Sequence, residues 1–291
     1  MHKKLKTILF VAVLFLSAGC TTLSEKKSVA PDSKTITVAS FNIQILGDSK
    51  ISNPDIIQTL AKIVRKFDIV AIQEVRSVHD NIIPTLLTYV NRTSPIYSYI
   101  ISTRLGRSNS KEQYVFIYNT QTISLIPNSS YVVSDSNDVF EREPFVAYFK
   151  SGNFDFKLVD IHTKPEDTPA ELMQLAVVVD NIYNSSEEKD VIALGDMNAD
   201  GNYFNENNLT STFPSWVQLI GNSEDTTVAS SSNTYDRMIT RPATSSSEYT
   251  GRSGVFRWNA EFGVTDMNFV KKVSDHYPVY AVFRTDLRDD D

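Results

Sequence analysis

The chain has 291 residues, of which 41% are apolar, and it carries a formal net charge of −7 at pH 7. This length suits one large domain or two small ones, and the apolar fraction is enough for a hydrophobic core. The acidic balance argues against a general polyanion-binding module, because contacts with phosphate need local lysine or arginine. It leaves open an enzyme that contacts a polyanion briefly.

The amino terminus has the pattern of a secretory signal over residues 1–19. A basic start at residues 2–6 is followed by an apolar stretch at residues 7–16 and then by small residues. About a dozen apolar residues are too few to span a bilayer, which needs roughly 20. The pattern therefore predicts export rather than a membrane-spanning helix.

Cys20 is the only cysteine and directly follows Ala-Gly, so no intrachain disulfide can form. This junction resembles the lipobox of bacterial lipoproteins, in which Cys20 would be lipidated, although Ser17 stands where leucine is usual. The polar residues 20–34 are expected to form a tether with a reach of about 20 Å. Because Thr21 is not the aspartate that favours retention at the inner membrane, we predict an outer-membrane lipid anchor. A secreted or periplasmic protein is the alternative.

Apolar runs with strand character recur along the rest of the chain. They cover residues 35–41, 68–73, 97–102, 113–118, 122–126, 145–150, 154–161, 190–195, 235–240 and 277–283. Helical spacing is expected at residues 54–66, 81–91 and 171–183. Many strand runs are continuously apolar, which is typical of strands covered on both faces. The pattern predicts two packed sheets flanked by helices in one domain, residues 35–285.

Local signals mark the start of the first helix and the main loops. Asn53 is expected to be the N-cap and Pro54 the first helical residue. Serine-rich stretches at residues 128–138, 221–234 and 243–254 are interpreted as surface loops rather than as linkers between domains.

Five short polar clusters stand at strand boundaries. They are residues 40–42, 73–76, 160–162, 195–200 and 274–278. Strand ends that converge at the edge of a sheet form a polar pocket, the usual shape of an active site. The hard oxygen donors in these clusters suit Mg²⁺, Mn²⁺ or Ca²⁺, and their histidines add proton transfer. The combination suggests hydrolysis of a phosphate ester.

Each cluster also has a purely structural interpretation. Residues 195–200 could be a tight turn, and residues 274–278 a turn before a strand with proline at its edge. The charge of Glu74, directly after an apolar run, would be costly to bury without a metal or cation partner. The joint occurrence of these ligand types at strand ends favours a site.

Two of the four histidines lie in these clusters. His2 belongs to the signal segment, and His79 is expected to be a solvated residue at the start of a helix. His162 and His276 stand at strand boundaries beside polar groups, where they could serve as acid and base near neutral pH.

The chain resembles the endonuclease/exonuclease/phosphatase superfamily, and within it the deoxyribonuclease I branch, from about residue 35 to residue 283. Several clusters occur across the superfamily, whereas seven segments in the same order are typical of the branch. These segments are residues 73–76, 105–107 leading to 111–114, 142–144, 195–200, 225–227, 235–237 and 275–279. The resemblance implies a four-layer α/β/β/α sandwich whose sheets present the site along one edge.

The resemblance also implies two histidine–carboxylate pairs for proton transfer. His162 would act with Glu112, and His276 with Asp236. One histidine would serve as base and the other as acid, and the sequence leaves the direction open.

A divalent cation, Mg²⁺ or Mn²⁺, is implied as the cofactor. Glu74 would hold it, with Asn42 and Asp275 close by. Asp196 and Asn198 would orient the attacking water and the scissile phosphate. A cation is needed because a phosphodiester near pH 7 repels hydroxide.

Two arginines match residues that contact DNA in the branch, Arg76 in the minor groove and Arg142 at a phosphate, although both could be ordinary salt-bridge residues. Gln44 departs from an arginine common at that position, and Ser110 from a tyrosine that packs against sugar and base. These departures should weaken duplex binding or shift the preference among nucleic acids.

Two structural calcium sites are further implications of the resemblance, and mere acidic loops are the alternative. Gly201 and Asn233 replace the cysteines of the main disulfide of the branch, so the loop after Asp225 must be held in another way. A Ca²⁺ ion at Asp225 and Thr227 could hold it. The second site would use Asp135, Asp138, Glu143 and the carbonyl of Phe140.

We therefore predict a monomeric, divalent-metal-dependent extracytoplasmic endodeoxyribonuclease that leaves 5′-phosphate oligonucleotides. The alternative is a phosphodiesterase or phosphatase that uses the same site on phospholipid headgroups or phosphoinositides. A non-catalytic surface lipoprotein that keeps the fold for binding is a third hypothesis.

Overall fold

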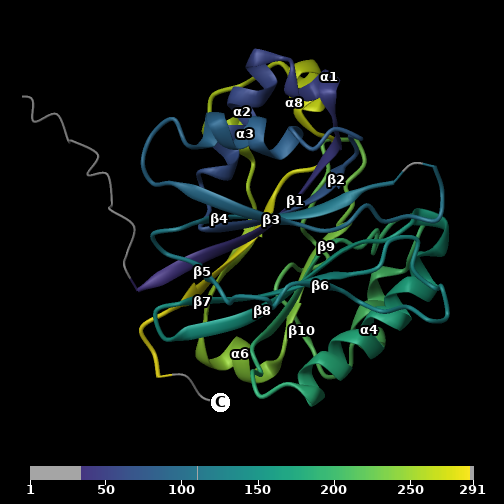
Figure 1. Cartoon of the computed structure of the whole chain (residues 1–291). Helices are drawn as coiled ribbons and strands as arrows, with labels where there is room; N and C mark the ends of the chain where they lie inside the picture. Colours follow the sequence, from purple (N-terminus) through teal and green to yellow (C-terminus); the bar gives the residue numbers. More distant parts are fainter. Residues whose placement is uncertain (1–33, 110, 289–291) are drawn as a thin grey trace, which may run out of the picture. The chain divides into compact units, whose positions relative to one another are not determined.

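The computed structural model describes residues 34–109 and 111–288, which form two β-sheets with helices on their outer faces (Figure 1). The predictions about the signal segment, Cys20 and Ser110 lie outside these residues. Within the described part of the chain, no helix is long and apolar enough to cross a membrane.

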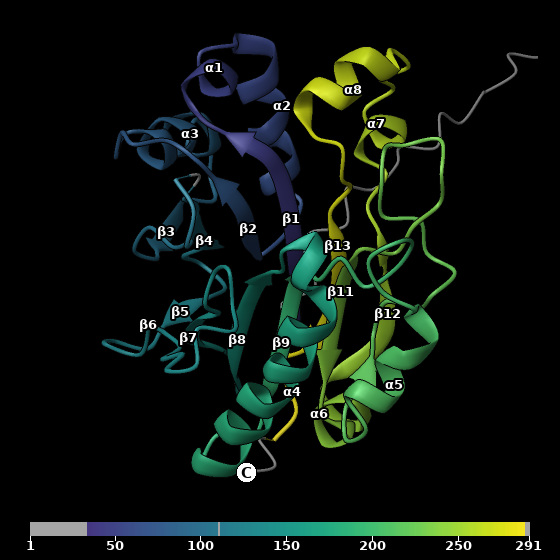
Figure 2. The same cartoon turned by 90° about the vertical axis from the view of Figure 1, so that its right-hand side faces the viewer.

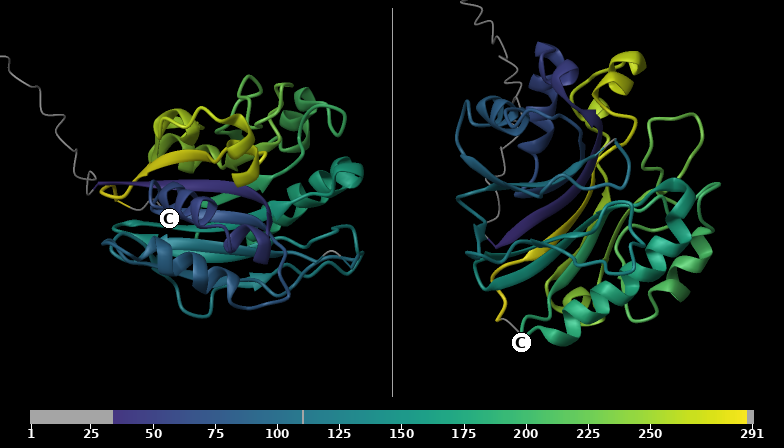
Figure 3. Two further views of the ribbon diagram at one scale, coloured as in Figure 1. Left: turned by 90° about the horizontal axis from the view of Figure 1, so that it is seen from above. Right: turned by 45° about the vertical axis from the view of Figure 1, so that its right-hand side comes forward.

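The first sheet contains one parallel pair among antiparallel neighbours. Its order is β12 (Tyr249–Val255), β13 (Val279–Arg284), β1 (Thr35–Leu46), β2 (Ile69–Val75), β4 (Gln113–Asn119) and β3 (Tyr97–Ile101). The strands β1 and β2 run parallel, so their carboxyl ends reach the same edge. Figure 3 shows β1 in purple beside β13 in yellow, with which it pairs antiparallel.

The second sheet repeats this plan. Its order is β10 (Val217–Gln218), β11 (Asp236–Thr240), β9 (Val191–Asp196), β8 (Phe154–His162), β7 (Phe145–Ser151) and β5 (Ser124–Leu125), with β6 (Tyr131–Val132) also paired to β7. Here β8 and β9 are the parallel pair, and His162 lies opposite Asp196 in their register.

Helices cover the outer face of each sheet. They are α1 (Asp48–Ile51), α2 (Pro54–Val64), α3 (Ile82–Val90), α4 (Thr168–Ser185), α5 (Leu209–Thr212), α6 (Pro242–Ser247), α7 (Trp258–Glu261) and α8 (Met267–Val273). In Figures 1 and 2, α1, α2, α3 and α8 lie on the side of the first sheet, and α4 and α6 lie on the side of the second. The predicted four-layer α/β/β/α sandwich is confirmed.

Successive side chains of a strand point to opposite faces of its sheet, and both faces are buried here, so the strand sequences are continuously apolar. In β2, Ile69 and Ala71 belong to the core that also contains Phe149 of the second sheet. Val70 and Ile72 belong to the core that contains Leu60 of helix α2. Each such strand is therefore buried on both faces.

The structure contradicts one loop assignment. Residues 243–254, predicted to be a surface loop, contain most of helix α6 and of strand β12. The stretch Tyr249–Val255 contains Gly251 and Gly254 and lacks an apolar run, so it carries no local strand signal. It becomes an edge strand because β13 supplies its hydrogen-bonding partners. Residues 128–138 are mainly loop but include β6, and residues 221–234 form a loop as expected.

The cap predicted for the first long helix is present. Oδ1 of Asn53 accepts the amides of Asp55 and Ile56 at 3.1 and 3.2 Å, and Pro54 opens the helix. Replacing Asn53 by alanine should therefore lower the free energy of unfolding by about 1 kcal/mol, measured by urea denaturation. Asn53→Asp keeps the acceptor and should stay close to the wild type, so an equal loss in both variants would contradict a capping role.

Candidate active site

Polar residues at or near the carboxyl ends of four strands meet at one edge of the sandwich. The parallel pair β1–β2 brings Asn42 and Glu74 there, and the parallel pair β8–β9 brings His162 and Asp196. Glu74 lies where the β2 register shifts, with a left-handed φ of 63°, so a bulge turns its side chain out of the strand pattern. Such strain in a non-glycine residue is common at functional sites.

His162 is paired with the buried carboxylate of Glu112. Its Nδ1 lies 2.8 Å from Oε2 of Glu112, while Oε1 accepts bonds from Arg76 at 2.6 Å and Arg142 at 3.3 Å. Burial alone would raise the pKa of Glu112, but His162, Arg142 and Arg76 lower it to about 2. Glu112 is therefore an anion that orients His162. Burial opposes charge on His162, yet Glu112 raises its pKa above the usual value.

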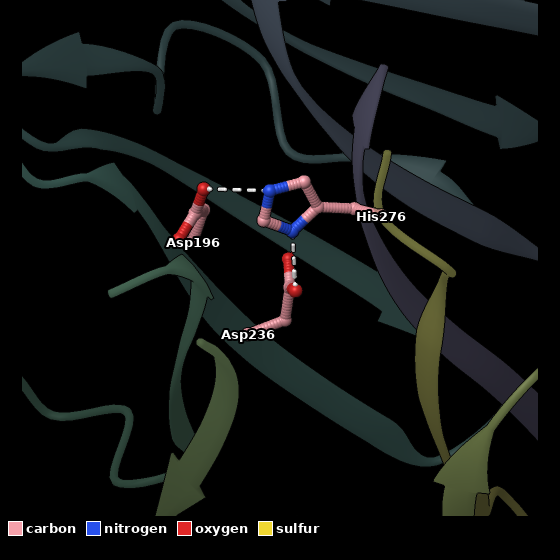
Figure 4. A group of neighbouring side chains, drawn as sticks. All are labelled: Asp196, Asp236 and His276. Carbon is pink, nitrogen blue, oxygen red and sulfur yellow. Dashed lines mark hydrogen bonds and ion pairs between the residues drawn. The ribbon is translucent and has the colours of Figure 1, made fainter. Parts of the chain in front are cut away.

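His276 forms the second pair, shown in Figure 4. Its Nδ1 lies 2.7 Å from Oδ2 of Asp236, and its Nε2 lies 3.5 Å from Oδ2 of Asp196. Burial would lower the pKa of His276, but these two carboxylates outweigh it and raise the pKa well above the ordinary value.

Asp196 links the two pairs. Its Oδ2 lies 3.6 Å from Nε2 of His162 and 3.5 Å from Nε2 of His276, so each imidazole has its own carboxylate at Nδ1 and shares Asp196 at Nε2. Burial would raise the pKa of Asp196, but the two histidines and Asn42 hold it below its usual value. The backbone amide of Asn198 donates to Oδ1 at 3.1 Å, and the Asn198 side chain donates to the carbonyl of Thr163 at 3.0 Å.

The residues predicted to hold a cation also lie together. The Asn42 side chain donates to Glu74 at 3.1 Å and to Asp196 at 2.9 Å, and Gln44 donates to Oδ2 of Asp275 at 2.7 Å. Oδ1 of Asp275 is buried without a hydrogen-bond partner. Burial raises the pKa of Asp275, and the nearby charge of Glu74 adds to this rise. Neighbouring carboxylates with an unpaired oxygen fit a hard divalent cation.

A second arrangement could also hold a metal ion. Asp196, Asp236 and His276 each offer a ligand atom, and these atoms lie within 4.8 Å of one another. The 2.7 Å contact between His276 and Asp236 has the length of a hydrogen bond, which instead suits proton transfer.

The two predicted DNA-contacting arginines differ in exposure. The side chain of Arg76 is 27% exposed and lies 3.3 Å from Glu74 as well as binding Glu112. The side chain of Arg142 is 7% exposed and donates to the carbonyls of His162 and Thr163. Both therefore fix the charged residues of the site, and contact with nucleic acid stays a prediction. His79 is exposed, as expected, and pairs with Asp48.

Lys50 was missed by sequence reasoning. Its ammonium group donates to the carbonyls of Gln44 and Val273 at 2.5 and 2.9 Å, beside the predicted cation ligands. Burial lowers the pKa of Lys50 to about 8, while Asp275 and Glu74 oppose this. Lys50 ties the bent end of β1 to the end of α8, and no local pattern marks a contact across more than 200 residues.

The loop predicted to bind calcium at Asp225 and Thr227 is held by protein donors. Oδ1 of Asp225 accepts the amide and the hydroxyl of Thr227, both at 3.1 Å, and the amide of Asn233 at 3.3 Å. Nη2 of Arg257 lies 3.3 Å from Oδ2 and donates to the Asp225 carbonyl at 2.6 Å. The guanidinium of Arg257 therefore already balances the charge of the Asp225 carboxylate. A calcium ion at this first site stays a prediction from the resemblance.

The second predicted calcium site is a closed turn. Oδ2 of Asp135 accepts the amide of Phe140 at 2.8 Å, and the carbonyl of Asp138 accepts from Arg107 at 2.9 Å. Among the described residues, Asp135, Asp138 and Glu143 do not form a three-ligand group. A calcium ion there stays a prediction.

A buried carboxyl supports the loop behind His162. Oε1 of Glu171, in the first turn of α4, accepts the amides of Glu141 and Lys164 at 3.1 and 3.3 Å, whereas Oε2 is buried without a partner. Burial raises the pKa of Glu171 from 4.5 to about 7, although these bonds oppose it.

This raised pKa predicts a pH-dependent stability. Between pH 4.5 and about 7 the folded state holds a proton that the unfolded state has lost, so the free energy of unfolding falls as pH rises. The total change is at most about 3 kcal/mol. Glu171→Gln should remove this slope and stabilise the protein above pH 7, measured by urea denaturation across pH. A slope unchanged in Glu171→Gln would contradict the assignment.

The fold is an α/β sandwich, and one edge of it carries two histidine–carboxylate pairs around Asp196. The model of the Endonuclease/Exonuclease/phosphatase family matches residues 39–276, and the chain belongs to this family. Within it the chain falls in the deoxyribonuclease I-like branch, as the sequence segments predicted.

The relatives on which this assignment to the branch rests each match more than four fifths of the chain. Deoxyribonuclease-1 of Bos taurus is 34% identical over 257 residues, covering 84% of this chain and 91% of that protein. Deoxyribonuclease gamma of Homo sapiens is 34% identical over 258 residues, covering 83% and 84%. A crystal structure of a family member from Bacteroides thetaiotaomicron superposes with a TM-score of 0.61 at 17% identity, covering 87% of this chain and 98% of that one. This last likeness supports the fold alone.

Proposed function

We propose that the protein is a divalent-metal-dependent endodeoxyribonuclease, with residues 35–285 as its catalytic domain. The observation that carries the proposal is the pair of imidazoles, each oriented by a buried carboxylate and both facing Asp196 within 3.6 Å. Phosphodiester hydrolysis needs one group to take a proton from water and another to protonate the leaving oxygen. Two oriented imidazoles on either side of one carboxylate meet that need.

Each residue has a defined task in this proposal. One of His162 and His276 accepts the proton of the attacking water at Nε2, and the other donates a proton to the departing 3′ oxygen. Asp196 orients the water, and Asn198 lies beside the phosphate. The products are 5′-phosphate and 3′-hydroxyl ends.

Glu74, Asn42 and Asp275 would hold Mg²⁺ or Mn²⁺ beside this centre. Bound there, the cation supplies positive charge that offsets the charge on the non-bridging phosphate oxygens. Asn42 couples the two parts, because its amide contacts both Glu74 and Asp196.

We also propose export and lipid anchoring. The sequence of residues 1–19 and the single Cys20 support both. Metabolic labelling with palmitate should mark the wild type, and Cys20→Ala should remove the label and release the protein from the membrane fraction. An unlabelled wild type would leave a secreted or periplasmic form.

Plasmid cleavage tests the catalytic proposal. Supercoiled plasmid should be nicked and degraded with Mg²⁺, and it should stay intact with EDTA or with His162→Ala. His79→Ala is the matched control, because His79 is exposed and lies outside the pairs. Intact plasmid under every metal condition would contradict the proposal. Turnover of sphingomyelin or inositol phosphates without DNA cleavage would favour the alternative substrate class.

A further inference from the structure

The loop of residues 225–234 is joined directly to both members of the His276–Asp236 pair. The carbonyl of Thr226 accepts the amide of Tyr277 at 2.8 Å, and Thr227 forms a β-bridge with His276 itself. Oγ1 of Thr226 accepts the amide of Asp236 at 3.2 Å. The backbone on both sides of the pair is therefore positioned by this turn.

A single side chain fastens the start of this turn. Nη2 of Arg257 contacts the carbonyl and the carboxylate of Asp225, and its guanidinium lies over the ring of Tyr277, 4.4 Å from the ring centre. Arg257 thus connects the residue that opens the turn with the residue that follows His276. Planar stacking and a forked set of donors are properties of arginine that lysine lacks.

The charge at this position is already balanced. Asp225 contributes one negative charge, and Arg257 contributes one positive charge at 3.3 Å. A divalent cation at the same carboxylate would be repelled by the guanidinium and would have to displace the hydrogens directed at Oδ1.

We infer that Arg257 takes the place of a structural calcium ion in this loop and acts as a positioning residue that holds His276 against Asp236. Two sets of contacts connect Arg257 with the pair. Arg257 binds Asp225 at the start of the turn, and the turn itself contacts Asp236 through Thr226 and His276 through Thr227. The effect on catalysis rests on the proposed nuclease function, whereas calcium independence and the geometry of the pair do not.

Two measurements without substrate test this inference. Any shift in Tm between EGTA and millimolar Ca²⁺ should be the same, within about 1 °C, in the wild type and in Asp225→Asn, because an ion bound at Asp225 would stabilise the wild type alone. In wild-type protein, NMR should show a downfield Nδ1–H resonance for His276, the signature of its bond to Asp236. That resonance should weaken or move in Arg257→Gln and should be unchanged in Arg252→Gln, an exposed arginine of strand β12.

The kinetic test separates positioning from binding. Arg257→Gln should lower kcat for plasmid nicking by about 10- to 100-fold, as small misplacements of catalytic groups do, with KM changed less than twofold. Arg257→Lys keeps the charge and should recover part of kcat, and it serves as the test if the glutamine variant does not fold.

The possible outcomes distinguish a failure of this inference from a failure of the proposed nuclease function. A rise in Tm with Ca²⁺ that is several degrees larger in the wild type than in Asp225→Asn, or an unchanged His276 resonance and kcat in Arg257→Gln, would overturn the inference. A wild type that does not cleave DNA, but still shows the same Ca²⁺ response as Asp225→Asn and the Arg257-dependent resonance, would overturn the proposed nuclease function while leaving this inference standing.

Discussion

Replacement of His276 by alanine is expected to lower kcat for plasmid cleavage by about 10²- to 10⁴-fold, the range that a positioned acid or base contributes. The imidazole lies between Asp236 at 2.7 Å and Asp196 at 3.5 Å, and alanine leaves Asp236 without an imidazole and Asp196 with His162 alone. KM should change little, because the interaction lost belongs to the transition state. Initial rates of supercoiled plasmid nicking at saturating Mg²⁺ measure both constants.

The second imidazole provides an internal comparison. His162→Ala should show a loss of similar size, since His162 occupies the equivalent position across Asp196. The double variant should lose much less than the product of the two single losses, because residues that act as a unit are not additive. His79→Ala should retain full activity. A rate within threefold of wild type for His276→Ala would exclude it from proton transfer.

Much of this site could be predicted from sequence because its residues lie near the carboxyl ends of parallel strands. The pairs β1–β2 and β8–β9 each end together at one edge, so a polar residue after each apolar run must reach that edge. The histidine–carboxylate partners came from the resemblance rather than from pattern. Nothing local marks Glu112 as the partner of His162, which lies 50 residues further along the chain.

The parts that sequence did not predict depend on contacts between distant residues. Strand β12 has no apolar alternation and exists through its pairing with β13. Glu74 has a left-handed backbone conformation at the bulge, and the neighbouring residues in the sequence do not predict it. Lys50 and Arg257 look like surface cations in sequence, and only folding brings backbone carbonyls and Asp225 to them.

The prediction of a calcium ion at Asp225 rests on a motif alone. Asp225 and Thr227 match calcium ligands in the branch, but a motif records the ligands and not the groups that compete for them. Arg257 comes 32 residues later and supplies a charge to the same carboxylate. The loop is held by the contacts of Asp225 with Thr227, Asn233 and Arg257, whereas the resemblance places the disulfide of the branch at positions 201 and 233.

Glu74→Gln is the second substitution with a large expected effect. Glutamine has the size and shape of glutamate, but both oxygens of Glu74 accept from N–H donors, Asn42 at 3.1 Å and the amide of Ile45 at 2.9 Å, so glutamine keeps only one of these two acceptors. It removes the charge that would hold the cation next to Asp275. The Mg²⁺ concentration for half-maximal nicking should rise more than about 100-fold, beyond the 10- to 100-fold typical of residues that only support a ligand.

Two comparisons make this result specific to the proposed cation position. Glu166→Gln removes the same charge from an exposed position and should leave the Mg²⁺ requirement unchanged. Asp236→Asn should lower kcat without raising that requirement, because Asp236 serves His276. The reverse pattern, with the Mg²⁺ requirement raised by Asp236→Asn and unaffected by Glu74→Gln, would place the ion at Asp196, Asp236 and His276 instead. Proton transfer would then have to be assigned to His162 and Glu112 alone.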